Sequence, residues 1–221
     1  KLVTGVPRMG DFLARMVPPD LSIARTVFAA TIETLQIAIV GTALGTAASL
    51  VLGPLAAANL TPRYIHQPLK TLLGILRGIP VILLALFFVA SVGLGPFPGV
   101  LALAFHSTGM LAKFYAESIE GAAPGPVEAL ATTGADWLQR IRFAVLPQIA
   151  PDLARDTLFR FEMNLRESLV LGLVGAGGIG FYIQLYTRSF HYEKVAMLTL
   201  VVLAMVVIVE QTSVFVRERL R

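Results

Sequence analysis

TLQIAIVGTALGTAASLVLGPLAAANLTP, residues 34–62, contains no charged side chain. About 20 consecutive apolar residues are enough for a helix to cross the roughly 30 Å hydrocarbon layer of a bilayer. The stretch is longer than that, so we predict a membrane-spanning helix at about 32–58. Residues 1–30 are expected to form an irregular extracytoplasmic or interfacial segment, with a short helix near 21–30 at the membrane surface.

The same reasoning predicts four further spans. Residues 78–112 carry no formal charge, and Gly95-Pro96-Phe97-Pro98-Gly99 divides them, because a helix cannot continue through two prolines set between glycines. The first of the two resulting spans is short, so its helix is expected to begin near 64–76 and to bend at Gly78-Ile79-Pro80. A polar helix and a last apolar helix follow, separated by a flexible break at 175–180. In chain order the predicted spans are 32–58, 80–94, 98–118, 149–174 and 192–216.

These spans define the expected fold class, an all-α membrane protein with about five transmembrane helices in one domain covering 31–221. Strands are not expected, because an open sheet edge cannot satisfy its hydrogen bonds in lipid. Basic loops mark the cytoplasmic side. The bias is modest, since residues 1–25 and 181–194 on the other side are also basic, and one more helix upstream of Lys1 would place the true N-terminus inside. The segments assigned to the cytoplasm are 60–77, 119–148 and 217–221.

The composition excludes several classes of protein. Of the 221 residues, 56% are hydrophobic and 14% are charged, with a mean hydropathy of +0.75, whereas a soluble domain has about 25% charged residues. The net charge of +4 does not indicate a nucleic-acid partner, because the basic residues flank apolar runs. The expected environment is a lipid bilayer. The absence of cysteine excludes disulfides and thiolate metal sites.

The most informative polar segment is Glu128-Ala129-Leu130-Ala131-Thr132-Thr133-Gly134, which is followed later by Leu146-Pro147. Pro126 fits the first turn of a helix, and Gly134 is expected to end that helix. A second helical stretch at 135–143 then leads to the second motif, where the chain turns back into the membrane. The loop 119–148 is therefore predicted to hold a compact helix across the cytoplasmic mouth.

This loop resembles the cytoplasmic EAA loop of permease subunits of type I, binding-protein-dependent ABC importers, whose pattern is E-A-A-x-x-x-G-x(9)-I-x-L-P. It departs from that pattern at Leu130, where alanine is usual, and at Ala144, where isoleucine is usual, but the spacing is intact. The wider chain, from about Gly10 to the end, is similar to the permease of phosphonate importers through ETLQIAIVGT (33–42), RGIPVILLALFFVASVGLGPFPGVLALAFHS (77–107) and RFEMNLRESLVLGLVGAGGIG (160–180). The residues that match the loop pattern are Glu128, Ala129, Gly134, Leu146 and Pro147.

The resemblance implies a multi-pass subunit of the bacterial inner membrane, with 31–221 as its permease domain. In such importers the loop docks in a cleft of a cytoplasmic ATPase dimer, and ATP-driven closure moves two permease halves from inward-facing to outward-facing. A homodimer and an extracytoplasmic solute-binding protein are implied as further partners. The chain has no G-x-x-x-x-G-K-[ST] phosphate loop, so it is not expected to be an enzyme or to hold a cofactor, and ATP and Mg are expected in the ATPase. Without the resemblance, the loop would be an ordinary amphipathic helix capped by glycine.

A second polar feature occupies the first half of the helix predicted at 149–174. Charged groups at membrane depth are costly and face a cavity or one another. One interpretation is that this helix lines the path and tolerates an anionic phosphonate, because the arginine fork suits such oxyanions. The other is that Asp156–Arg160 and Glu162–Arg166 neutralise each other as i,i+4 pairs in helix packing. The tentative path residues are Arg160, Asn164, Arg166, Glu167 and Ser168.

The glycine-rich break fits G-x-G-x-x-G, but a dinucleotide fold also needs a βαβ unit and an acidic residue about 20 positions later. Neither is present, so a structural or gating role is expected for Gly175, Gly177, Gly178 and Gly180.

Smaller features allow two readings each. His106 is expected to pack against a partner rather than to bind a ligand or relay protons, and Glu33 and Glu210 are expected to pair with basic residues in packing rather than to line the path. The small residues at 41–49 indicate close helix packing, either within the chain or at a dimer seam.

The leading function is an importer permease that forms the pathway for phosphonate-like oxyanions. The first alternative keeps this class and changes the cargo to phosphite, phosphate or an amino acid such as methionine. The others are a membrane scaffold that transports nothing and a soluble NAD enzyme.

Overall fold

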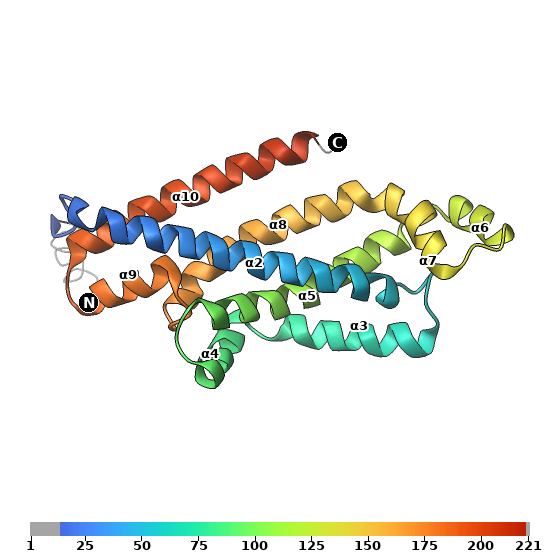
Figure 1. Cartoon of the computed structure of the whole chain (residues 1–221), viewed down its shortest axis with the longest axis horizontal. Helices are drawn as coiled ribbons and strands as arrows, with labels where there is room; N and C mark the ends of the chain where they lie inside the picture. The colour runs from blue at the N-terminus through green and yellow to red at the C-terminus, as the bar shows by residue number, and fades with distance from the viewer. Residues whose placement is uncertain (1–13, 220–221) are drawn as a thin grey trace, which may run out of the picture.

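The computed structural model describes residues 14–219, and all regular structure within them is helical. The long helices lie side by side along the longest axis, and two short helices cap one end (Figure 1). The long helices are α2 (Ala24–Ala56), α3 (Arg63–Gly78), α5 (Pro96–Glu120), α8 (Leu146–Gly172) and α10 (Tyr192–Arg219). The shorter elements are η1 (Leu21–Ile23), α4 (Val81–Val92), α6 (Pro124–Thr132), α7 (Trp137–Arg140), the π-helical η2 (Ile141–Val145) and α9 (Gly178–Arg188).

Two helices are long and apolar enough to cross a membrane by themselves, Leu21–Ala56 and Tyr192–Arg219. The pair α3 and α4 meets the same test as one span bent by 83°. Helices α5 and α8 have 25 and 27 residues, which at about 1.5 Å per residue also reach across the hydrocarbon layer. They carry more polar side chains, and together the five units account for the predicted spans.

The first helix differs from the prediction. It begins at Ala24, directly after η1, and continues without a break past residue 32. Residues 21–30 are therefore the start of the long helix and not a separate helix at the membrane surface. The chain enters it through Asp20, whose carboxylate accepts a hydrogen bond of 2.8 Å from the backbone N–H of Ser22.

The second span also differs. Helix α3 runs along the bundle, and α4, the core of the predicted span 80–94, turns sideways by 83° (Figure 1). The bend lies at Ile79-Pro80, as predicted. Because proline disfavours the α conformation of the residue before it, Ile79 is extended, with φ −78° and ψ 120°. Helix α9 begins in the predicted flexible break and continues into residues 181–194, which were predicted only as an extracytoplasmic connection.

The small residues of α2 pack inside the chain. A Cβ added to Gly41 would lie 2.7 Å from the Cβ of Leu103, and one added to Gly45 would lie 2.6 Å from the Cβ of Ser107. Both partners are on α5, so these glycines let the two backbones approach closely. The stretch 41–49 is thus an intrachain packing seam.

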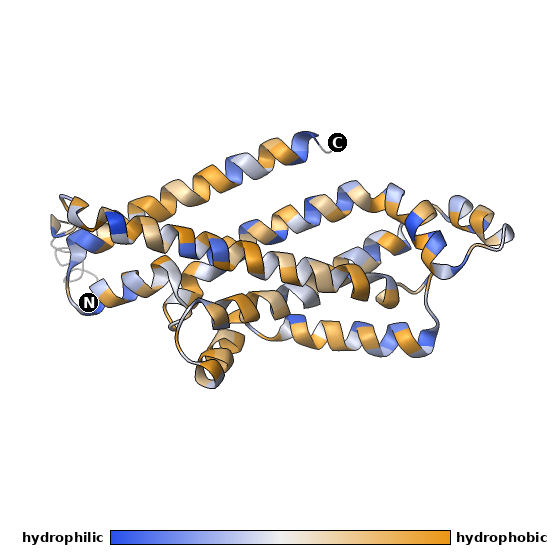
Figure 2. Ribbon diagram, viewed as in Figure 1, coloured by the Kyte–Doolittle hydropathy of each residue, from blue (hydrophilic) through white to orange (hydrophobic). Residues whose placement is uncertain are grey.

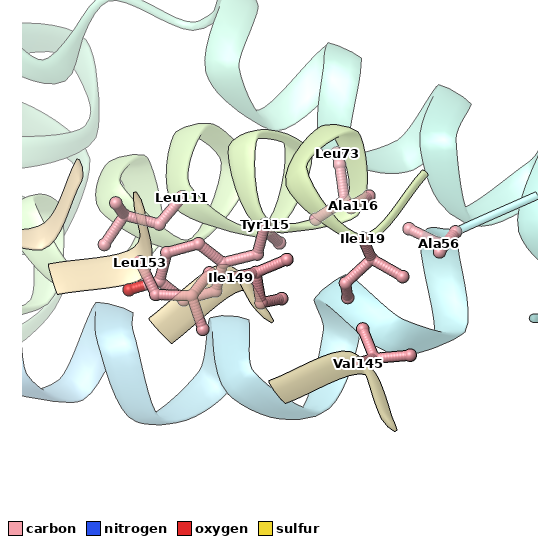
Figure 3. Packing of buried hydrophobic residues seen from close by; sticks show 11 residues of the cluster. Ala56, Leu73, Leu111, Tyr115, Ala116, Ile119, Val145, Ile149 and Leu153 are labelled. Atoms are coloured by element: carbon pink, nitrogen blue, oxygen red, sulfur yellow. The ribbon is translucent and has the colours of Figure 1, made fainter. Parts of the chain in front are cut away.

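An apolar core lies at the end of the bundle that carries the short helices, and Figure 3 shows it. Tyr115 of α5 is buried at its centre, and its hydroxyl lies 2.6 Å from the Thr157 hydroxyl of α8. Val145 and Ile149 pack against it from the other side. This core joins the membrane helices to the loop 119–148.

Candidate functional site

The loop 119–148 projects from the end of the bundle as α6, α7 and η2 (Figure 1). Glu128 and Ala129 lie on α6 and are exposed, and Gly134 follows α6 and is exposed with φ +81°. This left-handed conformation is readily adopted by glycine and costs other residues energy. It redirects the chain from α6 to α7, as the sequence predicted.

The loop has a defined conformation that its own side chains stabilise. The Asp136 carboxylate accepts a 2.7 Å hydrogen bond from the Gln139 N–H, and the Gln139 side chain accepts one of 2.9 Å from the Asp136 N–H. This reciprocal arrangement is a capping box. The Trp137 indole N–H also donates to the Leu60 carbonyl at 3.1 Å. The loop is thereby tied to the connection between α2 and α3.

Leu146 and Pro147 form the first turn of α8, where the missing N–H of proline costs nothing. The helix nevertheless does not start afresh at this point, because η2 leads into it continuously from α7. Apolar side chains remain open to the surroundings near the loop, with Leu138 65% and Phe143 62% exposed. The loop thus offers a surface with an exposed acid, small residues and apolar groups.

The polar residues of α8 divide into two sets. Arg160 is 1% exposed, and its guanidinium donates to the Glu167 carboxylate at 2.8 Å and to the Ser107 hydroxyl at 2.9 Å. The Asn164 amide, also buried, donates to the hydroxyls of Thr42 and Ser107 at 2.8 and 2.9 Å. This network, which we call the Arg160 network, joins α8 to α5 and α2.

The remaining polar residues of α8 point elsewhere. Arg166 is exposed and pairs with Glu210 of α10 at 3.2 Å, and Glu162 pairs with Arg217 at 2.9 Å. The Ser168 hydroxyl donates to the Leu165 carbonyl of its own helix at 2.7 Å. The predicted i,i+4 pairs are therefore wrong, since Arg160, Glu162 and Arg166 pair with residues farther away in the sequence, while the predicted pairing of Glu210 is confirmed.

His106 packs as predicted, with its Nδ1 2.8 Å from the Arg160 guanidinium. The sequence did not reveal Ser107 and Thr42 as the remaining polar partners. The only sequence signal for these two residues was a hydroxyl group at a position that faces a neighbouring helix. Recognising such a position requires the packing of α2 on α5 to be known.

The glycine-rich break packs tightly. Gly175 and Gly177 have φ of +93° and +80°, and the Gly95 N–H donates to the Gly175 carbonyl at 2.9 Å. Gly178 and Gly180 begin α9 rather than a loop, and a Cβ on Gly180 would collide with the Leu169 carbonyl. The segment allows the end of α8 and the start of α9 to approach closely.

The glycine-rich break contacts α2 as well. The Ile179 N–H donates to the Thr34 hydroxyl at 2.9 Å, and a Cβ on Gly177 would lie 2.5 Å from the carboxylate of Glu33. No salt bridge of Glu33 is found within residues 14–219, so its predicted basic partner is not seen in the part of the chain that the structure describes.

A bundle of long apolar helices with short exposed helices at one end is the architecture of a membrane protein. Comparison with known proteins identifies the family. Residues 49–221 match the family described as binding-protein-dependent transport system inner membrane component, and the chain belongs to this family. It is a permease subunit located in the inner membrane.

Two relatives extend this match. The chain is 41% identical over 221 residues to the phosphite transport system permease protein PtxC of Stutzerimonas stutzeri, covering 100% of this chain and 80% of that protein. It is 38% identical over 216 residues to the phosphate-import permease protein PhnE of Mycolicibacterium smegmatis, covering 97% of this chain and 40% of that protein.

A solved structure shares the fold. The MetNI methionine ABC transporter in an inward-facing conformation matches with a TM-score of 0.76 at 19% identity, over 90% of this chain and 96% of that chain. At this identity the match establishes the type I importer permease fold alone.

Proposed function

We propose that this permease carries phosphorus oxyanions, of which phosphonate and phosphite are the leading candidates, and that ATP hydrolysis in a separate subunit drives it. The loop 119–148 supports the proposal most directly. It is held rigidly by its capping box and by Trp137, and it presents Glu128 and Gly134 to the outside. Force applied to such a loop is passed to α8 through η2, because the two are continuous.

The proposed partners follow from this arrangement. A cytoplasmic ATPase dimer, which binds ATP and Mg, receives the loop through Glu128, Ala129 and Gly134, with Leu146 and Pro147 beginning the helix that it moves. A second copy of the chain supplies the other half of the pathway, and a solute-binding protein delivers the cargo from outside. The cargo is inferred from the oxyanions named in the relatives, and methionine is the weaker alternative.

Reversing the charge of Glu128 tests the coupling. The Glu128→Arg chain is expressed with its cognate ATPase and solute-binding protein in cells that lack other phosphite and phosphonate uptake. We expect ATP hydrolysis by the purified complex to persist while phosphite uptake is lost, because the exposed acid contributes to docking and not to the fold. Glu218→Arg, an exposed acid at the end of α10, is the matched control.

The cargo is tested in the same cells by competition among phosphite, phosphate, methylphosphonate and methionine. If methionine alone were taken up, methionine would replace the oxyanions as the proposed cargo. If Glu128→Arg changed neither hydrolysis nor uptake, the coupling role of the loop would be abandoned in favour of a scaffold.

A further inference from the structure

A groove of about 370 Å³ lies between α3 and α5, away from the polar residues of α8. Charged side chains from both helices line it, and Gly74 of α3 lies among them. A Cβ added to Gly74 would meet no atom within 4 Å, so the groove is open at this position. The charged residues of the lining are Lys70, Arg77, Lys113, Glu117 and Glu120.

The polar lining results from helical spacing. On α3, Lys70, Gly74 and Arg77 recur at intervals of four and three residues, which places them on one face. On α5, Lys113, Glu117 and Glu120 recur in the same way, and His106 lies two turns before Lys113. Figure 2 shows the resulting alternation of polar and apolar residues along α3. The two faces meet at the groove.

The charges of the groove do not balance within the chain. Lys70 pairs with Glu120 at 2.6 Å, and Lys113 lies 3.4 Å from Glu117. Arg77 is exposed, and the structure gives its guanidinium no ion pair within residues 14–219. The groove therefore has one cation in excess, in contrast to Arg160, whose charge meets Glu167 inside the bundle.

The surroundings of this cation must be aqueous or polar. A charged side chain that faces hydrocarbon costs several kcal/mol, so the polar face of α3 cannot lie against lipid. Its other face is apolar, and Leu72 and Ile75 are 59% and 61% exposed there. We infer that the apolar face contacts lipid or protein, whereas the groove holds water.

One end of the groove lies next to the polar interior of the bundle. Arg77 is the penultimate residue of α3, directly before the bend into α4, and its backbone packs closely on α5, since a Cβ added to Gly109 would lie 2.9 Å from the Arg77 nitrogen. His106, one turn before Gly109, contacts Arg160. Polar side chains thus continue from Arg160 and His106 to Arg77, and along the groove to Lys70 near the loop 119–148.

We propose that the α3–α5 groove forms the cytoplasmic half of the path for the transported oxyanion, and that Arg77 is the cation that contacts it. This inference rests on the proposed oxyanion cargo. The planar guanidinium matches the oxygens of phosphite or phosphonate and forms two hydrogen bonds at once. The pairs Lys70–Glu120 and Lys113–Glu117 are partly exposed and contribute little, so their lysines can exchange partners as the anion passes.

The absence of cysteine makes a direct test possible. Thr71→Cys places a thiol in the groove, and Leu72→Cys places one on the adjacent apolar face. Each variant of the assembled importer is treated in inside-out vesicles with a charged, membrane-impermeant methanethiosulfonate reagent. We expect rapid modification at 71 that blocks phosphite uptake and is slowed by added phosphite, and slow modification at 72.

A second experiment fills the groove with an uncharged side chain. Gly74→Phe is expected to abolish phosphite uptake, and Gly74→Ala to retain it, while both variants keep the normal protein level, because the site opens onto empty space. Reduced level of the alanine variant would show that the space is needed for folding and would overturn the inference.

Other outcomes also overturn it. If the reagent did not modify Thr71→Cys, the groove would lie in lipid. If the reagent modified this variant without loss of phosphite uptake, the groove would lie outside the path. Protection by phosphatidylglycerol in the vesicles, rather than by phosphite, would identify a lipid headgroup as the ligand. If the unaltered importer takes up no phosphite, phosphate or methylphosphonate, the proposed cargo fails, while labelling at 71 still reports whether the groove holds water.

Discussion

The Arg160 network and the α3–α5 groove place arginines in two different settings. Arg160 is buried, and its guanidinium is satisfied by Glu167, Ser107 and His106. Arg77 lies in an open groove that has a surplus of positive charge. The first arrangement fixes three helices to one another, and the second leaves a charge available to a ligand. The sequence pattern around the two arginines does not distinguish these roles. The structure does, because Arg160 has an ion-pair partner, Glu167, inside the bundle.

The largest effect is expected from breaking the buried pair. Arg160→Met leaves the Glu167 carboxylate without its partner, and removing one member of a buried ion pair costs about 3–5 kcal/mol. We predict a much lower melting temperature and less folded protein in the membrane. Thermal unfolding of the purified chain in detergent measures this.

The double variant Arg160→Met with Glu167→Gln sharpens the result. It removes the stranded charge and is expected to recover part of the lost stability. If Arg160→Met unfolded at the temperature of the unaltered protein, the network would not hold the helices together.

A smaller effect is expected at the seam beneath the network. Gly45→Val would place its Cβ 2.6 Å from that of Ser107, which separates α2 from α5 and disturbs the hydrogen bonds of Asn164. Overpacking of this kind costs about 1–3 kcal/mol. Ala43→Val, at an exposed position of the same helix, is the control in the thermal assay. Equal melting temperatures for the two variants would argue against close packing at this seam.

The smallest effect is expected for Arg166→Met. Both side chains of the Arg166–Glu210 pair are 50% exposed, and exposed pairs contribute about 0–1 kcal/mol. The melting temperature should therefore stay close to that of the unaltered protein. A loss as large as that of Arg160→Met would show that the pair is buried in the assembled importer.

Local signals in the sequence were enough for much of the fold. Charge-free runs located α2, α4, α5 and α10, Pro80 located the bend between α3 and α4, and Gly134 located the end of α6. The start of α2 was misplaced because the predicted span was bounded by the charge-free run, whereas a helix can carry charges such as Glu33 near its end without interruption. Helix α9 was missed because the glycines before it indicated only flexibility.

The site could be predicted only in part. The loop motif depends on neighbouring residues, so its pattern and spacing identified it. The groove depends on the register of α3 against α5, which brings Arg77 and Lys113 together from residues far apart in the sequence. The pairing of Arg160 with Glu167, two turns apart on α8, likewise depends on the packing of α8 against Ser107 of α5. Neither the groove nor this packing has a signature in one helix alone.

The most direct test of the contrast is phosphite uptake by the complete importer carrying Arg77→Gln. Loss of one charge-assisted hydrogen bond, about 1.5 kcal/mol, predicts a roughly tenfold lower rate at low phosphite with an unchanged melting temperature. Arg77→Lys should retain an intermediate rate, and Arg155→Gln, an exposed cation paired with Asp152 on α8, should match the unaltered protein. Uptake by Arg77→Gln equal to that of the unaltered importer would contradict the assignment of the α3–α5 groove to the path.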